Sequence, residues 1–331
     1  MRALVYTAPH ELEMRAEPEP QLAPGIAIVK VEAVGICGSD MHAYHGFDDR
    51  RPPPLILGHE AAGVVVEGAL KGRRVTVNPL ATCGECPACR SGEEHLCAGR
   101  QIISMPPRQG AFAEYVAVPE RNLVPLPDGF DIVKAALAEP LAVSYHAVTL
   151  GVSRLRRPAA AARTLVLGGG AIGLGAALVL AMSGVASIAV AETNALRQQT
   201  VAAAGPFTCY APGDRAEPAN GSIDLVIDAV GASATRAAAS RLVKPGGVIV
   251  HAGLLPGLDG LDVRRITLQE ITFIGTYCYT HADFCETVDA MICNRLGRLD
   301  WFEERALAEG ASAFAAIDAG SVAAAKIIVR P

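Results

Sequence analysis

Residues 36–60 contain side chains that could hold a reactive metal ion. Cys37 offers a thiolate, His59 an imidazole and Glu60 a carboxylate, and this set of sulfur, nitrogen and oxygen donors suits zinc. Ser39 and His42 follow the thiolate closely, where they could carry a proton away from a reacting group. The pattern predicts a catalytic zinc centre with one position open to substrate. The alternative is a buried cysteine among unrelated histidines, since a free cysteine is commonly a small core residue.

A second group of thiols has the spacing of a closed metal site. It comprises Cys83, Cys86, Cys89 and Cys97. Tight C-x-x-C turns can direct several sulfurs at one ion, and four thiolates fill a tetrahedral zinc site without leaving room for water. We therefore expect a structural zinc in a lobe at about residues 80–100, the alternative being four unrelated thiols. His95 is not needed as a ligand, and we expect it at the surface.

Glu139 is a further candidate for the metal centre. It stands in the sequence Glu139-Pro140-Leu141, flanked by alanine, leucine and valine. Proline is tolerated in the first turn of a helix, so a helix is expected to begin here. An isolated glutamate is usually solvated, but these apolar neighbours make full solvation less natural. We treat Glu139 as a ligand or as a group just behind the ligands.

A glycine-rich turn in the second half of the chain predicts a dinucleotide site. An apolar strand at 163–167 runs into Gly168-Gly169-Gly170-Ala171-Ile172-Gly173 and then into a helical stretch. Such a turn directs backbone N–H groups at a pyrophosphate. Glu192 ends the next strand, where a carboxylate binds the ribose hydroxyls and repels a 2′-phosphate. NAD(H) is therefore favoured, although Arg197 could accommodate the phosphate of NADP.

Length and composition set the class of protein. A chain of 331 residues is too long for one ordinary core, so two domains are expected. Its 51% hydrophobic and 19% charged residues are typical of a folded protein. A net charge of −5 argues against nucleic-acid binding, and no segment resembles a membrane span or a signal peptide. Nine cysteines in such a chain indicate metal binding rather than disulfides, and a cytoplasmic location follows as a default.

The order of the predicted elements places these groups. The first third contains short strands punctuated by glycine and proline, at 4–6, 26–34, 63–66, 75–77 and 115–118. This pattern is typical of a partly open β-barrel. From residue 163, apolar strands alternate with alanine-rich helices, which predicts a doubly wound parallel sheet. A terminal strand at 326–329 could pair back onto the first domain.

Taken together, the motifs resemble the zinc-dependent medium-chain dehydrogenase/reductase family, of the alcohol dehydrogenase-like type. The motifs that carry the resemblance are Gly35-Ile36-Cys37-Gly38-Ser39-Asp40, Gly58-His59-Glu60, the four-cysteine lobe, Glu139-Pro140-Leu141 and Val166-Leu167-Gly168-Gly169-Gly170. The Glu-Pro-Leu motif is similar to that of the polyol and threonine dehydrogenase branch. The resemblance implies a GroES-like catalytic domain at 1–145 and 277–331 around an inserted Rossmann domain at 146–276.

The resemblance also implies roles for individual residues. Cys37 and His59 would ligate the catalytic zinc, whereas for Glu60 and Glu139 direct ligation and a place behind the ligands both stay open. Ser39 and His42 would relay the proton, and Asp40 would orient a ligand or cap a turn. The residues expected along the cofactor cleft are Gly168, Gly170, Ile172, Gly173, Glu192, Arg197, Val230, Gly231, Leu254 and Thr276.

The function implied is NAD(H)-dependent interconversion of a secondary alcohol and its ketone, in a dimer or tetramer. The substrate would be a small polyol, sugar or hydroxy amino acid. Side chains considered for its pocket are Tyr44, Phe47, Met105 and Tyr279. The alternatives are a zinc-less NADPH-dependent reductase of the same superfamily and a non-catalytic zinc- or nucleotide-binding protein.

Overall fold

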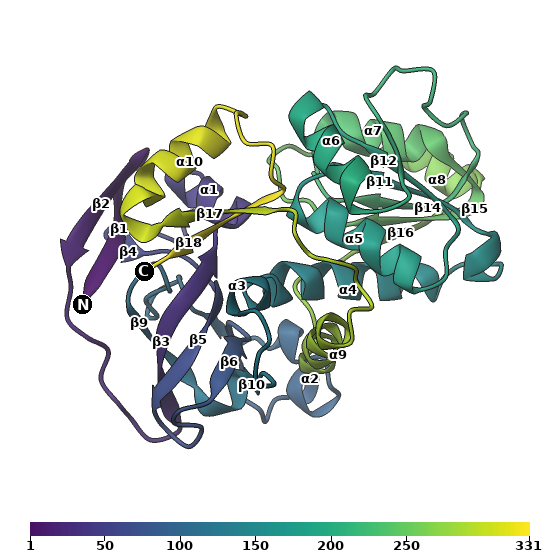
Figure 1. Cartoon of the computed structure of the whole chain (residues 1–331). Coiled ribbons are helices and arrows are strands. Elements are labelled where there is room, and N and C mark those ends of the chain that lie inside the picture. Colours follow the sequence, from purple (N-terminus) through teal and green to yellow (C-terminus); the bar gives the residue numbers. More distant parts are fainter.

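Strands from both ends of the chain meet in one mixed sheet, which lies in the left half of Figure 1. The computed structural model describes residues 1–331. The strands of this sheet are β3 (Ile26–Gly35), β5 (Glu60–Glu67), β6 (Arg74–Val77), β9 (Tyr115–Pro119), β10 (Leu123–Pro125), β17 (Phe302–Ala306) and β18 (Lys326–Arg330). They follow the order β10-β6-β5-β3-β18-β17, and β9 also pairs with β3. The terminal strand β18 runs antiparallel to β3 through Val329 and Val34.

Two smaller sheets complete this half of the molecule. The first joins β2 (Glu11–Ala16), β1 (Arg2–Ala8) and β4 (Leu55–Ile56), and the second joins β7 (Leu80–Ala81) to β8 (Gln101–Ile102). One core fills the space between the sheets and includes Leu4, Val31, Phe112, Phe314 and Val329. Because its members come from both ends of the chain, this half requires the C-terminal segment to be complete.

The right half of Figure 1 is a parallel sheet with helices on both faces. Its strands are β11 (Arg163–Leu167), β12 (Ser187–Ala191), β13 (Thr208–Tyr210), β14 (Ile223–Asp228), β15 (Val243–His251) and β16 (Thr272–Gly275). Their order, β13-β12-β11-β14-β15-β16, is that of a doubly wound dinucleotide-binding fold. The helices between these strands are α5 (Ala171–Met182), α6 (Ala195–Ala204), α7 (Ser233–Leu242) and α8 (Val263–Leu268).

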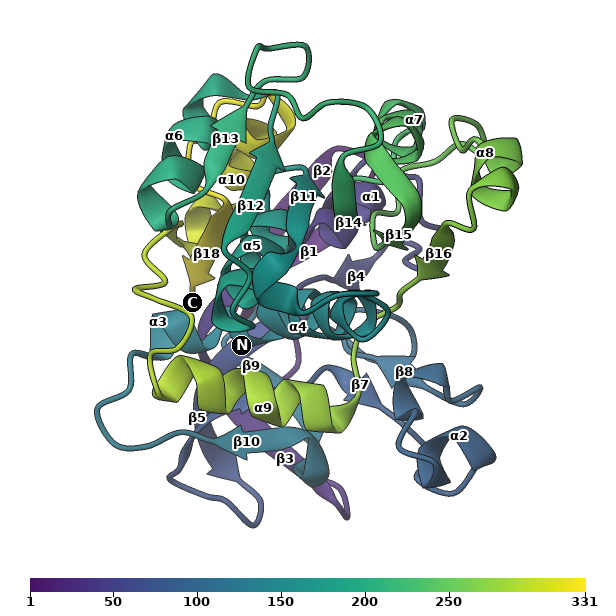
Figure 2. The ribbon, with the colours of Figure 1, turned by 90° about the vertical axis from the view of Figure 1, so that its right-hand side faces the viewer.

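Helix α4 (Ala138–Val152) connects the two halves. It packs against α5, β14 and β15 on one side and touches β5 on the other. Helix α9 (His281–Ile292) lies beside it, as Figure 2 shows. Pro140 falls in the first turn of α4, where its missing N–H costs no hydrogen bond. Glu139 is thus fixed at the start of a buried helix.

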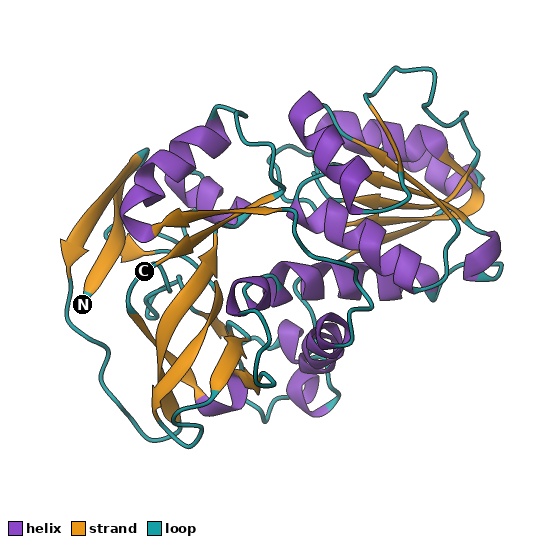
Figure 3. Ribbon diagram, in the orientation of Figure 1, coloured by secondary structure: helices purple, strands orange, loops and turns teal.

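All but one of the remaining elements belong to loops of the mixed-sheet half (Figure 3), the exception being the 3-10 turn that directly precedes β11. The α-helices are α1 (Gly38–Tyr44), α2 (Pro87–Arg90), α3 (Ile132–Ala135) and α10 (Gly310–Asp318). Short 3-10 turns occupy Glu94–Leu96, Glu120–Asn122, Ala159–Ala161 and Leu307–Glu309.

The predicted strands and the return of the terminal strand are all present. The partly open barrel corresponds to the mixed sheet, and the doubly wound sheet has the expected strand order. The expectation for His95 is wrong. This side chain is only 6% exposed because its ring packs against that of His146 on α4, at 4.9 Å between centroids. None of the helices combines the length and apolar character needed to span a membrane.

Candidate active site and metal centres

A cavity of about 830 Å³ is lined by residues of both halves. Ser39, His42 and Glu139 line it. So do the residues expected along the cofactor cleft, with the exception of Gly231: Gly168, Gly170, Ile172, Gly173, Glu192, Arg197, Val230, Leu254 and Thr276. Of the side chains considered for the substrate pocket, Met105 lines the cavity, whereas Tyr44 and Tyr279 are buried outside it and Phe47 is 72% exposed. The structure thus brings the two sequence motifs, metal and dinucleotide, to one space.

The three donors predicted for the metal centre converge. Cys37 precedes the first turn of α1, His59 directly precedes β5, and Glu60 begins that strand. Their ligand atoms all lie within 4.8 Å of one another. Glu60 Oε2 is buried and has no hydrogen-bond partner, which is costly unless a cation or donor satisfies it. This donor set and the unsatisfied oxygen fit a zinc ion.

Asp40 holds the metal donors in place. Its Oδ2 accepts a hydrogen bond from the Cys37 backbone N–H at 2.9 Å, and its Oδ1 accepts one from the Gly58 N–H at 3.2 Å. The same Oδ1 lies 3.5 Å from His59 Nδ1, and Ser104 Oγ lies 3.2 Å from that nitrogen. The other ring nitrogen, Nε2, therefore remains for a metal. Asp40 fulfils both suggested roles, because it caps α1 and orients the imidazole.

Glu60 has a partner that the sequence did not suggest. Lys326, the first residue of β18, places its Nζ 2.6 Å from Glu60 Oε1 and 3.0 Å from the Ile36 carbonyl oxygen. Both side chains are almost fully buried. Burial lowers the pKa of Lys326, but the charge and hydrogen bond of Glu60 and the charges of Cys37 and Glu139 together outweigh it, so this pKa lies above its usual value. The pair holds one carboxylate oxygen, Oε1, and leaves the buried Oε2 without a hydrogen-bond partner.

Glu139 occupies the cavity wall at the start of α4. Its Oε1 accepts a hydrogen bond from the Tyr279 hydroxyl at 3.0 Å. Burial raises the pKa of Glu139 to about 7; His59 opposes this rise, and the nearby charge of Glu60 adds to it. A bound cation would act in the opposite direction and favour the carboxylate. The two carboxylates thus differ in geometry, because Glu60 belongs to the compact donor group and Glu139 faces the open cavity.

Ser39 and His42 lie on α1 beside the donors. Ser39 Oγ is 3.4 Å from His59 Nε2, which places the hydroxyl next to any group bound in the open position. Burial is the main cause that lowers the pKa of His42, and the positive charges of Arg50 and Arg51 contribute, against the opposing effect of Asp48. A neutral imidazole at pH 7 is the form that can accept a proton.

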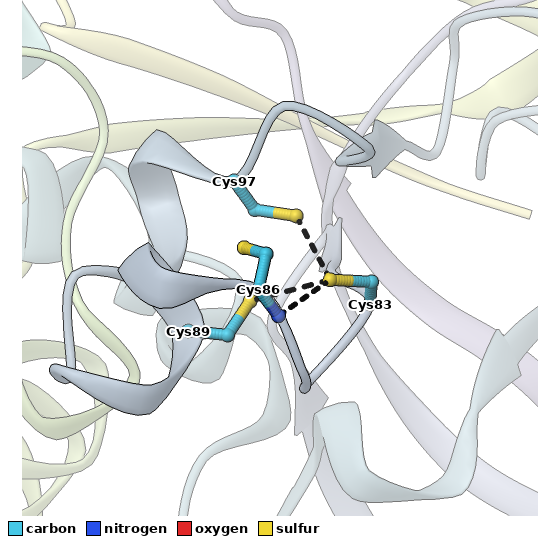
Figure 4. Close-up of side chains that lie close together, drawn as sticks. All are labelled: Cys83, Cys86, Cys89 and Cys97. Atoms are coloured by element: carbon cyan, nitrogen blue, oxygen red, sulfur yellow. Dashed lines mark hydrogen bonds between the residues drawn. The ribbon is translucent and has the colours of Figure 1, made fainter.

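The four cysteines of the lobe around α2 form a separate cluster, shown in Figure 4 with their side chains directed at one another. The sulfurs of Cys83 and Cys89 are 3.8 Å apart, and those of Cys83 and Cys97 are 3.5 Å apart. Zinc–sulfur bonds of about 2.3 Å in a tetrahedron give sulfur separations of roughly 3.8 Å. The geometry therefore fits a four-thiolate zinc site without an open position.

The glycine turn between β11 and α5 has the form that a dinucleotide needs. Gly168 adopts φ +96°, and a Cβ on Gly173 would lie 1.8 Å from the Gly168 carbonyl oxygen. Gly170 is the N-cap residue that directly precedes α5, a Cβ there would enter open space, and no side chain caps this helix end. Its N–H groups are thus available to a phosphate.

Two acidic residues organise the rest of this half. Glu192 accepts hydrogen bonds from the N–H of Gly169 and of Asn194, both at 2.8 Å, and lies 3.6 Å from the Arg197 guanidinium. Asp228 accepts from the N–H of Val230 at 3.1 Å and of Gly231 at 2.9 Å. Asp228 was not foreseen, although an aspartate at the carboxyl end of a buried parallel strand is a usable signal.

This fold and this pair of sites define a two-domain protein built to hold a metal ion against a dinucleotide. Residues 23–128 match the family model described as alcohol dehydrogenase GroES-like domain, and residues 171–292 match the one described as zinc-binding dehydrogenase. The chain is 33% identical over 320 residues to L-galactonate-5-dehydrogenase of Escherichia coli (strain K12), covering 89% of this chain and 91% of the relative.

Further relatives have the same two-part organisation. The chain is 30% identical over 293 residues to L-threonine 3-dehydrogenase of Pyrococcus horikoshii, with 83% of this chain and 82% of that protein covered. A solved structure described as a zinc-binding dehydrogenase from Sinorhizobium meliloti 1021 bound to NADP has a TM-score of 0.86 and 30% identity, and it covers 100% of this chain and 99% of its own. The chain belongs to the zinc-binding alcohol dehydrogenase family and is an oxidoreductase. The predicted family and fold class are confirmed.

Proposed function

We propose that this protein interconverts a secondary alcohol of the polyol, sugar or hydroxy amino acid type and its ketone, using zinc and NAD(H). The observation that carries the proposal is that Cys37, His59 and Ser39 line the same cavity as the glycine turn of the parallel sheet. Relatives named as dehydrogenases of galactonate and of threonine support this reaction type. Both names describe oxidation of an alcohol on a small polar molecule.

In this proposal Cys37, His59 and one carboxylate would hold the catalytic zinc. When bound, the zinc would supply Lewis acidity toward the alcohol oxygen, and the nicotinamide would supply the acceptor for hydride. Ser39 Oγ, 3.4 Å from His59 Nε2, accepts the proton of the substrate hydroxyl and at the same time releases its own hydroxyl proton toward His42, which lies on the same helix α1. His42, kept neutral by its lowered pKa, passes that proton to solvent. Apolar side chains such as Met105 and Ile102 line this part of the cavity and limit the access of water.

We propose Glu60 as the carboxylate ligand and Glu139 as the group that faces substrate or water. Glu60 belongs to the compact donor group and has an unsatisfied buried oxygen, whereas Glu139 is held by Tyr279. The four-cysteine cluster would hold a second, structural zinc, as its sulfur separations support.

NAD(H) is the proposed cofactor in preference to NADP(H). Glu192 is 5% exposed and is fixed by two backbone N–H groups at the end of β12. A carboxylate fixed there binds ribose hydroxyls and repels a 2′-phosphate. Arg197 lies against Glu192, and this ion pair offsets the attraction of the Arg197 guanidinium for a 2′-phosphate.

We further propose that two copies of the chain associate through the edge of the parallel sheet. Strand β16 pairs with β15 on one side only. Exposed apolar side chains surround this edge, namely Leu258, Val263, Leu268 and Phe273. An exposed apolar patch of this kind commonly marks a protein interface.

The proposed domain division assigns residues 1–145 and 277–331 to the half with the mixed sheet and residues 146–276 to the half with the parallel sheet. A cytoplasmic location remains the expectation for a chain with nine free thiols.

Substitution of the thiolate tests the proposed function. Cys37→Ser should lower bound zinc by one equivalent and reduce alcohol-dependent NADH formation at least about 10³-fold, since the metal chemistry is lost. Cys209→Ser, a thiol outside both clusters, is the matched control and should keep zinc and activity. Full activity in Cys37→Ser, or turnover with NADPH and no bound zinc in the wild type, would favour the zinc-less reductase instead.

A further inference from the structure

Two arginines line the cavity near the metal centre, whereas the acid that they share does not. Arg50 and Arg51 belong to the lining, and Asp48 lies behind them. Arg51 Nη1 is 2.5 Å from Asp48 Oδ2, and Arg50 Nε is 2.7 Å from Asp48 Oδ1. Because guanidinium groups stay protonated in proteins, one carboxylate cannot balance both. Asp48 alone therefore does not neutralise this part of the wall.

Arg51 is placed next to the reacting groups. Its side chain is 3% exposed, and its Nη2 lies 3.5 Å from Ser39 Oγ. Its Nε donates to the Ser104 carbonyl oxygen at 3.1 Å. Three of its five N–H groups thus have protein partners, and two remain for a ligand. A buried cation with unused donors is unfavourable unless a bound anion or polar group completes its bonding.

The other acids of the cavity wall are engaged elsewhere. The remaining lining carboxylates are Glu139, Glu192 and Glu217. Glu139 is bound to Tyr279, Glu192 holds the glycine turn, and Glu217 pairs with Arg241 on the parallel-sheet half. Arg100 adds further positive charge nearby, since its guanidinium lies 4.8 Å from the ring centroid of Tyr277, another lining residue. Asp40, the other buried acid near Arg51, already accepts hydrogen bonds from the N–H groups of Cys37 and Gly58, so Asp48 is the carboxylate that the two arginines share.

We propose that the substrate carries a carboxylate that Arg51 and Arg50 bind, while its secondary alcohol lies against Ser39. The proposal rests on the dehydrogenase function proposed above and narrows its substrate to hydroxy acids of the sugar-acid type. Arginine binds carboxylates through two parallel hydrogen bonds, which fixes their orientation. A neutral polyol would leave the two free N–H groups of the buried Arg51 without an anionic partner.

The distances limit the length of this acid. Ser39 Oγ and Arg51 Nη2 are 3.5 Å apart. The substrate hydroxyl lies one hydrogen bond from the first atom, and the substrate carboxylate lies one hydrogen bond from the second. With about 2.8 Å for each hydrogen bond, the two substrate oxygens lie at most about 9 Å apart. An aldonate of about five or six carbons fits this limit.

Matched pairs of substrates test the inference. Aldonates and the alditols of the same carbon skeleton are compared as substrates of the wild type, Arg50→Met, Arg51→Lys and Arg73→Met. The wild type should prefer aldonates at least about tenfold in kcat/KM. Arg50→Met should raise the KM for aldonates about 10- to 100-fold with little change in kcat, and should leave alditols within about twofold. Arg51→Lys should raise the KM for aldonates more than that for alditols, because Arg51 lies beside Ser39 as well. Arg73, which is exposed and outside the cavity, is the control.

A binding measurement without turnover gives an independent result. Pentanoate, a carboxylate without a hydroxyl group, should inhibit the wild type competitively, and the inhibition should weaken about tenfold in Arg50→Met. Inhibition by the neutral pentanamide should not change. Arg50 is 58% exposed, so its loss leaves the fold intact.

Two outcomes separate this inference from the proposed function. Equal use of alditols and aldonates by the wild type, or an equal loss of both in the arginine variants, would overturn the carboxylate site and leave the dehydrogenase intact. The second of these results would mean that Arg51 acts on Ser39 rather than on substrate. Failure of the zinc-loaded wild type to reduce NAD⁺ with any member of either series, and with hydroxy amino acids such as threonine, would overturn the proposed function itself.

Discussion

Replacement of Lys326 should destabilise the protein because it leaves the buried carboxylate of Glu60 without its partner. The side chains are 3% and 0% exposed, and the N–O distance is 2.6 Å. Removing one member of a buried ion pair costs about 3–5 kcal/mol. At about 2 °C per kcal/mol for a chain of this length, Lys326→Met should lower Tm of the metal-free protein by roughly 6–10 °C.

The effect should depend on metal and on Glu60. If Glu60 ligates zinc, the ion replaces the lost ammonium, and the fall in Tm should be smaller in the zinc-loaded protein. The double variant Glu60→Gln/Lys326→Met should be more stable than the sum of the single effects predicts, because neither charge is left unpaired. Since the pKa of Lys326 is raised, its contribution is complete at neutral pH and is lost only as pH rises through that raised pKa.

Differential scanning calorimetry of metal-free and zinc-loaded protein measures these values. Lys30→Met, a substitution of an exposed lysine on β3, is the control and should stay within about 0.5 kcal/mol of the wild type. An unchanged Tm in metal-free Lys326→Met, or purely additive effects in the double variant, would refute the assigned ion pair. An equal loss with and without zinc would instead move the carboxylate ligand from Glu60 to Glu139.

Three further substitutions test the remaining assignments. Cys89→Ala should lose one zinc and lower Tm, with kcat little changed. Metal analysis and calorimetry measure this loss, with Cys293→Ser, a substitution of an exposed thiol, as the control. An unchanged melting curve would contradict a structural zinc. Glu192→Ala should narrow the ratio of kcat/KM for NAD⁺ over NADP⁺ about 10- to 100-fold, and an unaltered ratio would place cofactor selection elsewhere. Asp228→Asn should cost about 1.5–3 kcal/mol at pH 7 and weaken NADH binding. Burial raises the pKa of Asp228, but hydrogen bonds from His251, Gly231 and Val230 outweigh it and lower that pKa. The stabilisation that Asp228 gives the folded protein is therefore present above about pH 4 and is lost as pH falls further. A stability difference between Asp228→Asn and the wild type that does not change with pH would refute this account.

The sequence predicted the parts of the molecule that depend on local pattern. The glycine turn, its flanking strand and helix and Glu192 lie within 163–192, and a doubly wound sheet follows from their order. Cys37 and His59 were paired from their donor types and from the motifs around them, and the structure explains their approach, because β3 and β5 are antiparallel and Gly35 faces Glu60. Short chain separations and regular periodicity therefore carried these inferences.

The contacts that shape the reactive site could not be predicted in this way. Lys326 is 266 residues from Glu60, Tyr279 is 140 residues from Glu139, and Arg51 meets the backbone of Ser104 across 53 residues. No spacing rule relates such pairs, and a lysine at the start of an apolar strand reads as solvated. His95 was misplaced for the same reason, since its polar neighbours say nothing of His146 on a distant helix.

These long-range contacts share one origin, which is the return of the chain from the parallel sheet to the mixed sheet. After β16 the chain contributes Tyr277 to the cavity wall and Tyr279 to Glu139, and β18 then brings Lys326 to Glu60. The metal centre is therefore completed only when the C-terminal segment has paired with β3. Because the same segment crosses from one half to the other, a change in the packing of the two halves must alter the environment of both carboxylates. The polarity of the reactive site is thus set by the chain's return as much as by the loop that carries the ligands.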